Sequence, residues 1–181
     1  MRSHVWACCL GGILLAGIGP EGASFGAEPG AGSSVTSFAE LTQIKKFVSI
    51  EVQTLGTAEK LRLKGGELTD AMRAAFLKNV PGIALEMSGG PSPEGTERLR
   101  EIGFFTCEVW TVGEAYTVAY HLDCNAGSYS MPRSPGTLWN RAILGYGLKD
   151  EISDMVRHGL HSMIEQFATT FYKVRGEKVL Q

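Results

Sequence analysis

The chain has 181 residues, which is enough for one domain with a core of its own. Hydrophobic residues make up 44% of it and charged residues 20%, as in an ordinary globular protein. The formal net charge is -2, and no long run of like charges is present. This balance argues against the basic surface by which proteins bind nucleic acids, so we expect no nucleic-acid partner.

The N-terminus has the pattern of a secretory signal peptide, which we place at residues 1–26. Arg2 and His4 precede an apolar run over residues 5–18, Pro20 breaks this run, and small residues follow. The run is shorter than the about 20 residues that a membrane span needs. An uncleaved N-terminal anchor is the alternative. The pattern predicts an exported protein of the periplasm or cell envelope, with no stable membrane span after cleavage.

Residues 27–37 follow this segment and are rich in glycine, serine and other small residues. Such a composition predicts a flexible linker. We expect a single domain over residues 38–175 and a short C-terminal tail over residues 176–181.

The first half of this domain predicts one strand, one helix and a short second strand. Residues 47–55, FVSIEVQTL, alternate between apolar and polar, which indicates a strand with one buried and one solvated face. A helix is predicted over residues 68–82, with Thr69 as its N-cap. A short strand is expected over residues 83–87, followed by a loop and a short helix capped by Ser92.

Two segments rich in aromatic and β-branched residues, 104–112 and 115–124, predict a hairpin. The Gly-Glu dipeptide between them fits a two-residue type II′ turn. That turn would displace Cys107 from Cys124 by about four residues along the strands, too far for a disulfide, and so it favours two buried thiols. A four-residue loop shifted towards Tyr116 would align them, and an oxidising compartment would then permit the disulfide.

The C-terminal part predicts a polar loop over residues 125–136, a strand over residues 137–144 and a tight glycine turn at residues 145–147. Apolar residues at spacings of three and four then predict a long helix from about Asp150 to Val174. Strand, glycine turn and helix have the order of a phosphate-binding loop. However, Asp150 stands where such a loop needs a third glycine, and carboxylates crowd the helix N-terminus. We expect no nucleotide.

The order β-α-β-(α)-β-β-β-α, with one apolar stripe on each helix, predicts an α+β fold. We expect a two-layer sandwich in which two main helices cover one face of a largely antiparallel sheet of four to five strands. The other face would be open to solvent, because Ser49, Glu51 and Gln53 point away from the core.

Tryptophans are candidate anchors for a protein contact on that open face. By alternation, Trp110 shares its side with Glu108, and Trp139 shares its side with Arg141. Alternatively, the loop around residues 88–100 folds over the tryptophans and covers them. We interpret one set of residues as a candidate interaction face: Trp110, Trp139, Glu108, His121 and Arg141.

A second set of polar residues suggests a metal site. His121 and Asp123 share one face of a strand, and Glu108 lies diagonally across from His121 in the predicted register. The three side chains together could bind a divalent metal, but we favour cross-strand pairing on a solvated face, because a zinc site normally needs three or four well-placed ligands. Cys107 with His121 as its base is a further alternative, but a mid-strand cysteine on an apolar face is usually inert. We predict no catalytic residue and no cofactor.

The order of the segments is similar to that of small exported bacterial proteins of unknown function. A leader and a lone amphipathic strand precede LTDAMRAAFLKNVPGIAL and paired aromatic strands, and TLWNRAILGYG then leads into a helix ending IEQFATTFYKVRG. The likeness spans most of residues 38–175 and rests chiefly on Trp139, Gly145, Gly147 and Phe167. It implies an envelope or periplasmic setting and a compact α+β domain, and it brings no catalytic residues.

The sequence therefore predicts an exported, non-enzymatic accessory or interaction domain of the bacterial cell envelope, with another envelope protein as its partner. The alternative is a metal-binding protein or a metal-dependent enzyme that uses His121, Asp123 and Glu108.

Overall fold

The computed structural model describes residues 38–86, 96–131 and 134–177. The chain divides into two units, Met1–Gly32 and Ser33–Gln181, and all described residues belong to the second. The predicted signal peptide and linker lie outside the described residues. So do the expected cap at Ser92 and the last four residues of the expected tail.

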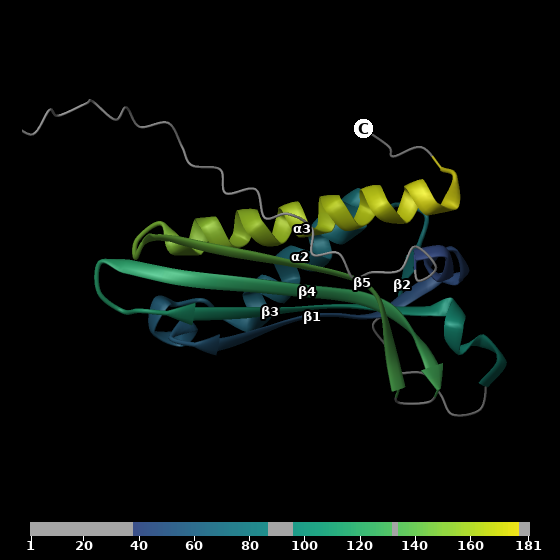
Figure 1. The fold of residues 1–181 in the computed structure, drawn as a ribbon, viewed down its shortest axis with the longest axis horizontal. Coiled ribbons are helices and arrows are strands. Elements are labelled where there is room, and N and C mark those ends of the chain that lie inside the picture. The colour runs from purple at the N-terminus through teal and green to yellow at the C-terminus, as the bar shows by residue number, and fades with distance from the viewer. Residues whose placement is uncertain (1–37, 87–95, 132–133, 178–181) are drawn as a thin grey trace, which may run out of the picture. The chain divides into compact units, whose positions relative to one another are not determined.

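The described elements follow the predicted order of strands and helices, with short 3-10 helices added (Figure 1). In chain order they are η1 (Glu40–Gln43), β1 (Lys46–Gly56), η2 (Ala58–Leu61), α2 (Gly65–Asn79), β2 (Ala84–Leu85), η3 (Thr96–Glu101), β3 (Ile102–Val112), β4 (Thr117–Met131), β5 (Ser134–Leu148) and α3 (Ile152–Arg175). The predicted α+β two-layer fold is confirmed.

The five strands form one mixed sheet in the order β2-β1-β3-β4-β5. β1 runs parallel to both of its neighbours, while β3, β4 and β5 are antiparallel to one another. The parallel half follows from the connections, because a chain that crosses over through a helix returns in the same direction. The antiparallel half is a meander of two hairpins.

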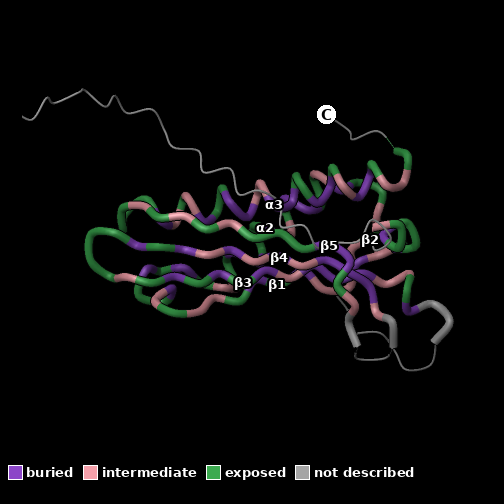
Figure 2. Tube along the Cα trace, in the orientation of Figure 1, coloured by how far each residue is buried: buried purple, intermediate pink, exposed green. Residues whose placement is uncertain are grey.

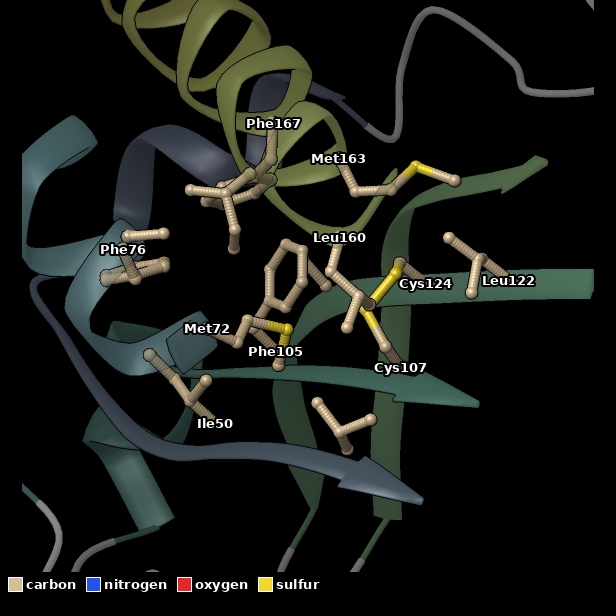
Figure 3. Packing of buried hydrophobic residues seen from close by; sticks show 14 of the residues in the cluster. Ile50, Met72, Phe76, Phe105, Cys107, Leu122, Cys124, Leu160, Met163 and Phe167 are labelled. Carbon is tan, nitrogen blue, oxygen red and sulfur yellow. A yellow bond between two sulfur atoms is a disulfide. The ribbon is translucent and has the colours of Figure 1, made fainter. Parts of the chain in front are cut away.

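The core lies between one face of the sheet and the two main helices (Figure 3). Phe105 of β3 is central, since its ring centroid lies 6.2 Å from that of Phe76 on α2 and 5.1 Å from that of Phe167 on α3. Trp139 of β5 packs 5.4 Å from Phe167. Both helices therefore share one face of the sheet, and neither of them covers the opposite face.

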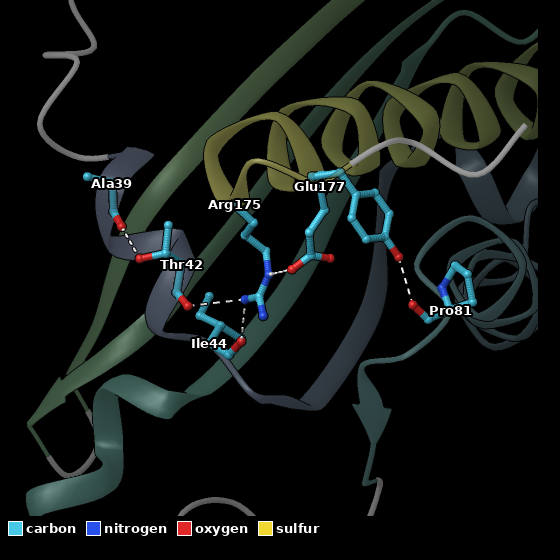
Figure 4. Close-up of polar contacts among 7 residues, drawn as sticks. Ala39, Thr42, Ile44, Pro81, Arg175 and Glu177 are labelled. Carbon is cyan, nitrogen blue, oxygen red and sulfur yellow. Dashed lines mark hydrogen bonds and ion pairs between the residues drawn. The ribbon is translucent and has the colours of Figure 1, made fainter.

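The C-terminal end of α3 is fastened to the start of the domain (Figure 4). Arg175 donates hydrogen bonds to the backbone oxygens of Thr42, at 3.2 Å, and Ile44, at 3.0 Å. The Tyr172 hydroxyl donates to Pro81 O at 2.8 Å. Burial, and to a lesser extent the Glu177 carboxylate, raises the pKa of Tyr172 above its usual value. These bonds fix the position of α3 over the sheet.

The first main helix begins earlier than predicted, and Thr69 is not its N-cap. α2 starts at Gly65, and the buried Thr69 hydroxyl accepts a hydrogen bond from Val52 N–H of β1 at 2.9 Å. Gly65 permits this early start, because a Cβ there would lie 2.9 Å from Val52 O. Thr69 therefore joins the helix to the strand rather than capping the helix.

The predicted two-residue turn between β3 and β4 is wrong. The loop is Gly113–Tyr116, and Val112 faces Ala119 across the hairpin. Cys107 consequently faces Cys124 with a Cα–Cα distance of 4.1 Å, and the two form a disulfide. The expectation of two buried thiols is wrong and the alternative of a disulfide is correct, but six residues rather than four separate the last hairpin pair, Val112 and Ala119. Cys107 is therefore not a free nucleophile.

The predicted polar loop and glycine turn are also wrong, because both segments are largely strand. β4 continues to Met131, and β5 runs from Ser134 through both glycines to Leu148. The glycines allow close packing: a Cβ on Gly145 would lie 2.5 Å from the Tyr120 ring, and one on Gly147 would collide with Met155 Sδ of α3. The chain turns instead at residues 149–151, just before α3.

Candidate functional site: the open face of the sheet

The sheet face opposite the helices changes in character along the strands. Towards the β3–β4 hairpin it is apolar, and we call this part the apolar patch. Its members come from three strands and are Leu55, Trp110, Val112, Leu144, Tyr146 and Leu148. Figure 2 shows that the second half of β5, which supplies three of them, consists of exposed and half-buried residues.

The register of the sheet brings these residues into adjacent rows. Leu55 faces Trp110, Trp110 faces His121, and His121 faces Leu144. In the next row Val112 and Tyr146 lie on either side of a small residue of β4. Side chains opposite each other on one face are in contact distance, so the six residues, together with His121 and Ala119 of β4 between them, form one continuous surface.

The apolar patch is comparable in size to the largest apolar patches that monomers expose. The exposed fractions are 47% for Trp110, 68% for Val112, 79% for Leu144, 75% for Tyr146 and 57% for Leu148. Five large residues exposed to this degree present roughly 700 Å² in total, polar atoms included, so that their apolar area is on the order of 500 Å². The largest apolar patch on a typical monomer is about 300–600 Å², and a standard protein interface buries about 800 Å² per partner.

Polar residues occupy the middle of the open face, next to the apolar patch. Glu108 of β3 lies directly opposite Asp123 of β4. The Asn140 amide of β5 donates to Asp123 Oδ1 at 2.6 Å and to Asn125 Oδ1 at 2.9 Å. Trp110 Nε1 donates to Glu108 Oε2 at 3.4 Å. These bonds align the side chains and leave a negatively charged border beside the patch.

The far end of the open face is covered by the chain's own aromatic rings. Phe104 is only 6% exposed, and its ring centroid lies 5.7 Å from that of Tyr129 in an edge-to-face contact. Burial, and then the nearby Glu51 carboxylate, raises the pKa of Tyr129 above its usual value. Among the residues whose side chains the structure describes, only those at the hairpin end of the face therefore present large apolar side chains to solvent.

The structure brings together three of the five residues predicted for the interaction face. Trp110, Glu108 and His121 are neighbours on the open face. The assignment of Trp139 is corrected: it is 1% exposed and lies in the core, covered by α3. Arg141 does share its side with Trp139, but that side faces the helices, and Arg141 lines a groove of about 310 Å³ beside α3.

Sequence reasoning missed most of the apolar patch. Leu144, Tyr146 and Leu148 were expected at a strand end and in a glycine turn, and Val112 was not considered. A signal was present, because every second residue from Ala142 to Leu148 is apolar while the residues between include two glycines. Period-two alternation of this kind indicates a continuing strand.

The predicted metal ligands share the open face without forming a site. Glu108 faces Asp123, and His121 lies diagonally across from Glu108. Among the residues that the structure describes, no group of three or more histidine, cysteine, aspartate or glutamate side chains is placed to hold a metal ion. Asp123 instead accepts a hydrogen bond from Asn140.

A larger groove of about 580 Å³ lies between the free side of β1 and the start of α2. Its lining is mixed, with Gln53, Asp70 and Arg73 among the polar residues. Like the groove beside α3, it opens widely to solvent and contains no histidine or cysteine.

No described helix is both long and apolar enough to cross a membrane.

Comparison with known proteins adds little to this geometry. No protein-family model and no curated protein matches the chain. A crystal structure of an uncharacterized protein is 10% identical and matches 70% of this chain and 88% of its own length, with a TM-score of 0.39. A dodecamer of a point variant of PelC from Paraburkholderia phytofirmans is 7% identical, matches 71% and 90% of the two chains, and has a TM-score of 0.40. A second PelC dodecamer crystal has a TM-score of 0.35 at 7% identity, over 75% and 90%. Similarities as low as these assign no function to the chain.

Proposed function

We propose that this protein is an exported, non-enzymatic interaction domain of the bacterial cell envelope and that it binds another envelope protein through the apolar patch. The observation that carries the proposal is the patch itself. Trp110 and Tyr146 belong to residue types that dominate binding energy at protein interfaces. Their exposure on a rigid sheet face, among aliphatic neighbours, is the arrangement of a docking surface.

Two features support an extracytoplasmic setting. Residues 1–26 have the pattern of a signal peptide. The disulfide between Cys107 and Cys124 is a bond that persists in oxidising compartments and is rare in the cytosol.

The charge beside the patch indicates what the partner presents. Glu108 and Asp123 lie opposite each other at its border. Carboxylates at the rim of an interface select partners with complementary charge and raise the association rate more than the affinity. The partner surface that fits is therefore an apolar centre flanked by lysine or arginine.

Site-specific cross-linking in intact envelopes tests the proposal. A photo-reactive amino acid in place of Val112 should cross-link an envelope protein, because this position is exposed within the patch. The same amino acid in place of Glu165, on the outer side of α3, is the matched control and should give no such product. Trp110→Ser should reduce the product about tenfold or more, as expected for a central aromatic anchor.

Two results would overturn the assignment. Equal products from both positions, or a product from Val112 that Trp110→Ser leaves unchanged, would show that the patch is not the docking surface. Cell fractionation with N-terminal sequencing tests export separately: an intact N-terminus in the cytosol would remove the envelope part of the proposal.

A further inference from the structure

The outer edge of β5 is a long row of unpaired backbone groups. β5 has 15 residues and is the last strand of the sheet. Lys149 N–H donates to Tyr116 O at 3.1 Å, and hydrogen bonding to a neighbouring antiparallel strand alternates along the chain. Odd-numbered residues of this part of β5 therefore bond to β4, and even-numbered residues direct N–H and C=O groups outward. Leu148 O accepts the Glu151 N–H at 3.0 Å, and no described residue bonds to the outward groups of Ala142, Leu144 and Tyr146.

The side chains along this edge lack the features by which proteins normally prevent strands from pairing. Ala142, Leu144, Tyr146 and Leu148 project onto the open face, and the alternate positions hold Ile143 and two glycines. Between Ala142 and Leu148 there is no lysine, no other charged residue and no proline. Natural edge strands usually carry such residues, a bulge or a covering segment. This stretch is therefore competent to accept another strand.

We propose that a second copy of this chain occupies the edge, with the two β5 strands antiparallel about a two-fold axis. Such an axis requires the surface to be complementary to itself. In the register centred on Leu144, the middle of the strand pairs apolar residues: Leu144 meets its own counterpart, and Ala142 meets Tyr146. At the ends, Leu148 meets the polar Asn140. On the helix side Ile143 meets Gly145, a large side chain against a position with none.

Charge favours the same register. Arg141 is the only charged residue of the described second half of β5, and Lys149 follows the strand. A register centred one residue later would set Arg141 opposite Lys149, and like charges directly opposite each other are destabilising. Centring on Leu144 sets Arg141 opposite Gly147 instead.

The pairing joins the two sheets into one and brings the two apolar patches side by side on the same open face. It shares Leu144 and Tyr146 with the proposed docking surface but makes no use of Trp110, so a change at Trp110 separates the two proposals. If both proposals hold, the dimer presents two adjacent patches to its partner, and binding gains from multivalency without a new contact.

Sedimentation analysis of the full chain over a range of concentrations tests the pairing with matched variants. Leu144→Pro removes an outward N–H that β4 does not use, and proline is tolerated at such edge positions. It should raise the dimer dissociation constant about tenfold or more, because two symmetry-related hydrogen bonds are lost. Leu144→Val keeps the N–H and the apolar character and should leave the constant within about threefold. Trp110→Ser should also leave it unchanged.

Amide hydrogen exchange of the wild-type chain gives a second measurement that needs no variant. The N–H groups of Ala142, Leu144, Tyr146 and Leu148 should be protected at high concentration and should exchange quickly on dilution. A chain that stays monomeric at about 100 μM, or a dimer in which these four amides exchange freely, overturns the inference. Loss of envelope cross-linking in Trp110→Ser with an intact dimer would leave it standing, so the two proposals fail separately.

Discussion

The two edges of the sheet are treated differently by the same chain. At the β1 edge, α2 supplies side chains to the backbone: Thr69 accepts the Val52 N–H at 2.9 Å, and Arg73 donates to Ile50 O at 3.2 Å. The two-residue strand β2 pairs with the start of β1. At the β5 edge, no described side chain takes a comparable position.

The difference between the two edges supports the proposed pairing of a second copy at the β5 edge. Side-chain hydrogen bonds protect the β1 edge. The β5 edge has no such protection among the described residues, although it is longer and more apolar. An unprotected edge is a template on which another chain can pair, and the β5 edge is the one where we propose the second copy. Variants at each edge and in the sheet between them test this contrast.

The largest effect is expected from the disulfide, which joins the half of the sheet next to the β1 edge to the half next to the β5 edge. Replacing Cys107 and Cys124 together by alanine should lower the free energy of unfolding by about 3 kcal/mol, because the unfolded chain is no longer constrained. Urea unfolding with and without reductant measures this. Reductant should destabilise the wild type and leave the double variant unchanged; equal responses would show that the cysteines are not paired.

A smaller effect is expected from Gly147→Ala on the β5 side. The added methyl group would meet Met155 of α3, and overpacking of this kind costs about 1–3 kcal/mol. Gly66→Ala in the first turn of α2 is the matched control, because nothing lies within 4 Å of the added atom. Thermal or urea unfolding of both variants is the measurement. Equal stabilities would contradict a packing role for Gly147.

Thr69→Val should cost about 1–2 kcal/mol, since it leaves the Val52 N–H without its acceptor. The variant should also make the β1 edge resemble the β5 edge and increase self-association, which light scattering detects. Thr69→Ser retains the hydroxyl and serves as the control. If Thr69→Val were as stable and as soluble as Thr69→Ser, the hydrogen bond would not protect the edge.

The smallest effect concerns alkaline pH. The pKa values of Tyr129 and Tyr172 are raised in the folded protein, chiefly by burial. The neutral phenols therefore favour the fold at pH values below the ordinary tyrosine pKa of about 10, and this contribution is lost as pH rises through the raised values. Urea midpoints between about pH 9 and pH 11 should fall less steeply when both tyrosines are replaced by phenylalanine. If the urea midpoints of the wild type and of the double variant fell equally with pH, the raised pKa values of the two tyrosines would be contradicted.

Much of the fold follows from periodicity in the sequence. The apolar stripe of α3 and the alternation of β1 are long enough to specify element type and buried face, and the class and element order follow from them. Alternation also placed Trp110 correctly on the open face of the sheet, on the other side of the strand from the buried Cys107.

The errors arise where periodicity carries no information. Moving the β3–β4 register by four residues keeps every side chain on its face, so alternation could not separate the predicted turn from the disulfide-forming one. Trp139 and Arg141 were correctly placed on one side, but which side faces the helices depends on where α3 packs. The glycines of β5 suggested a turn in the sequence. Their actual role is to leave space for side chains such as Met155 of α3, and a contact between distant segments cannot be read from local sequence.

The hydrogen bonds from Arg175 to Thr42 and Ile44 determine where the two ends of the domain lie relative to the apolar patch. It gathers the entry and exit of the domain at one pole, beside the start of β1. The apolar patch begins with Leu55, near the other end of that strand, about 30 Å away. A domain anchored through either of its ends would therefore carry the proposed docking patch at the far end of β1, about 30 Å from the anchor.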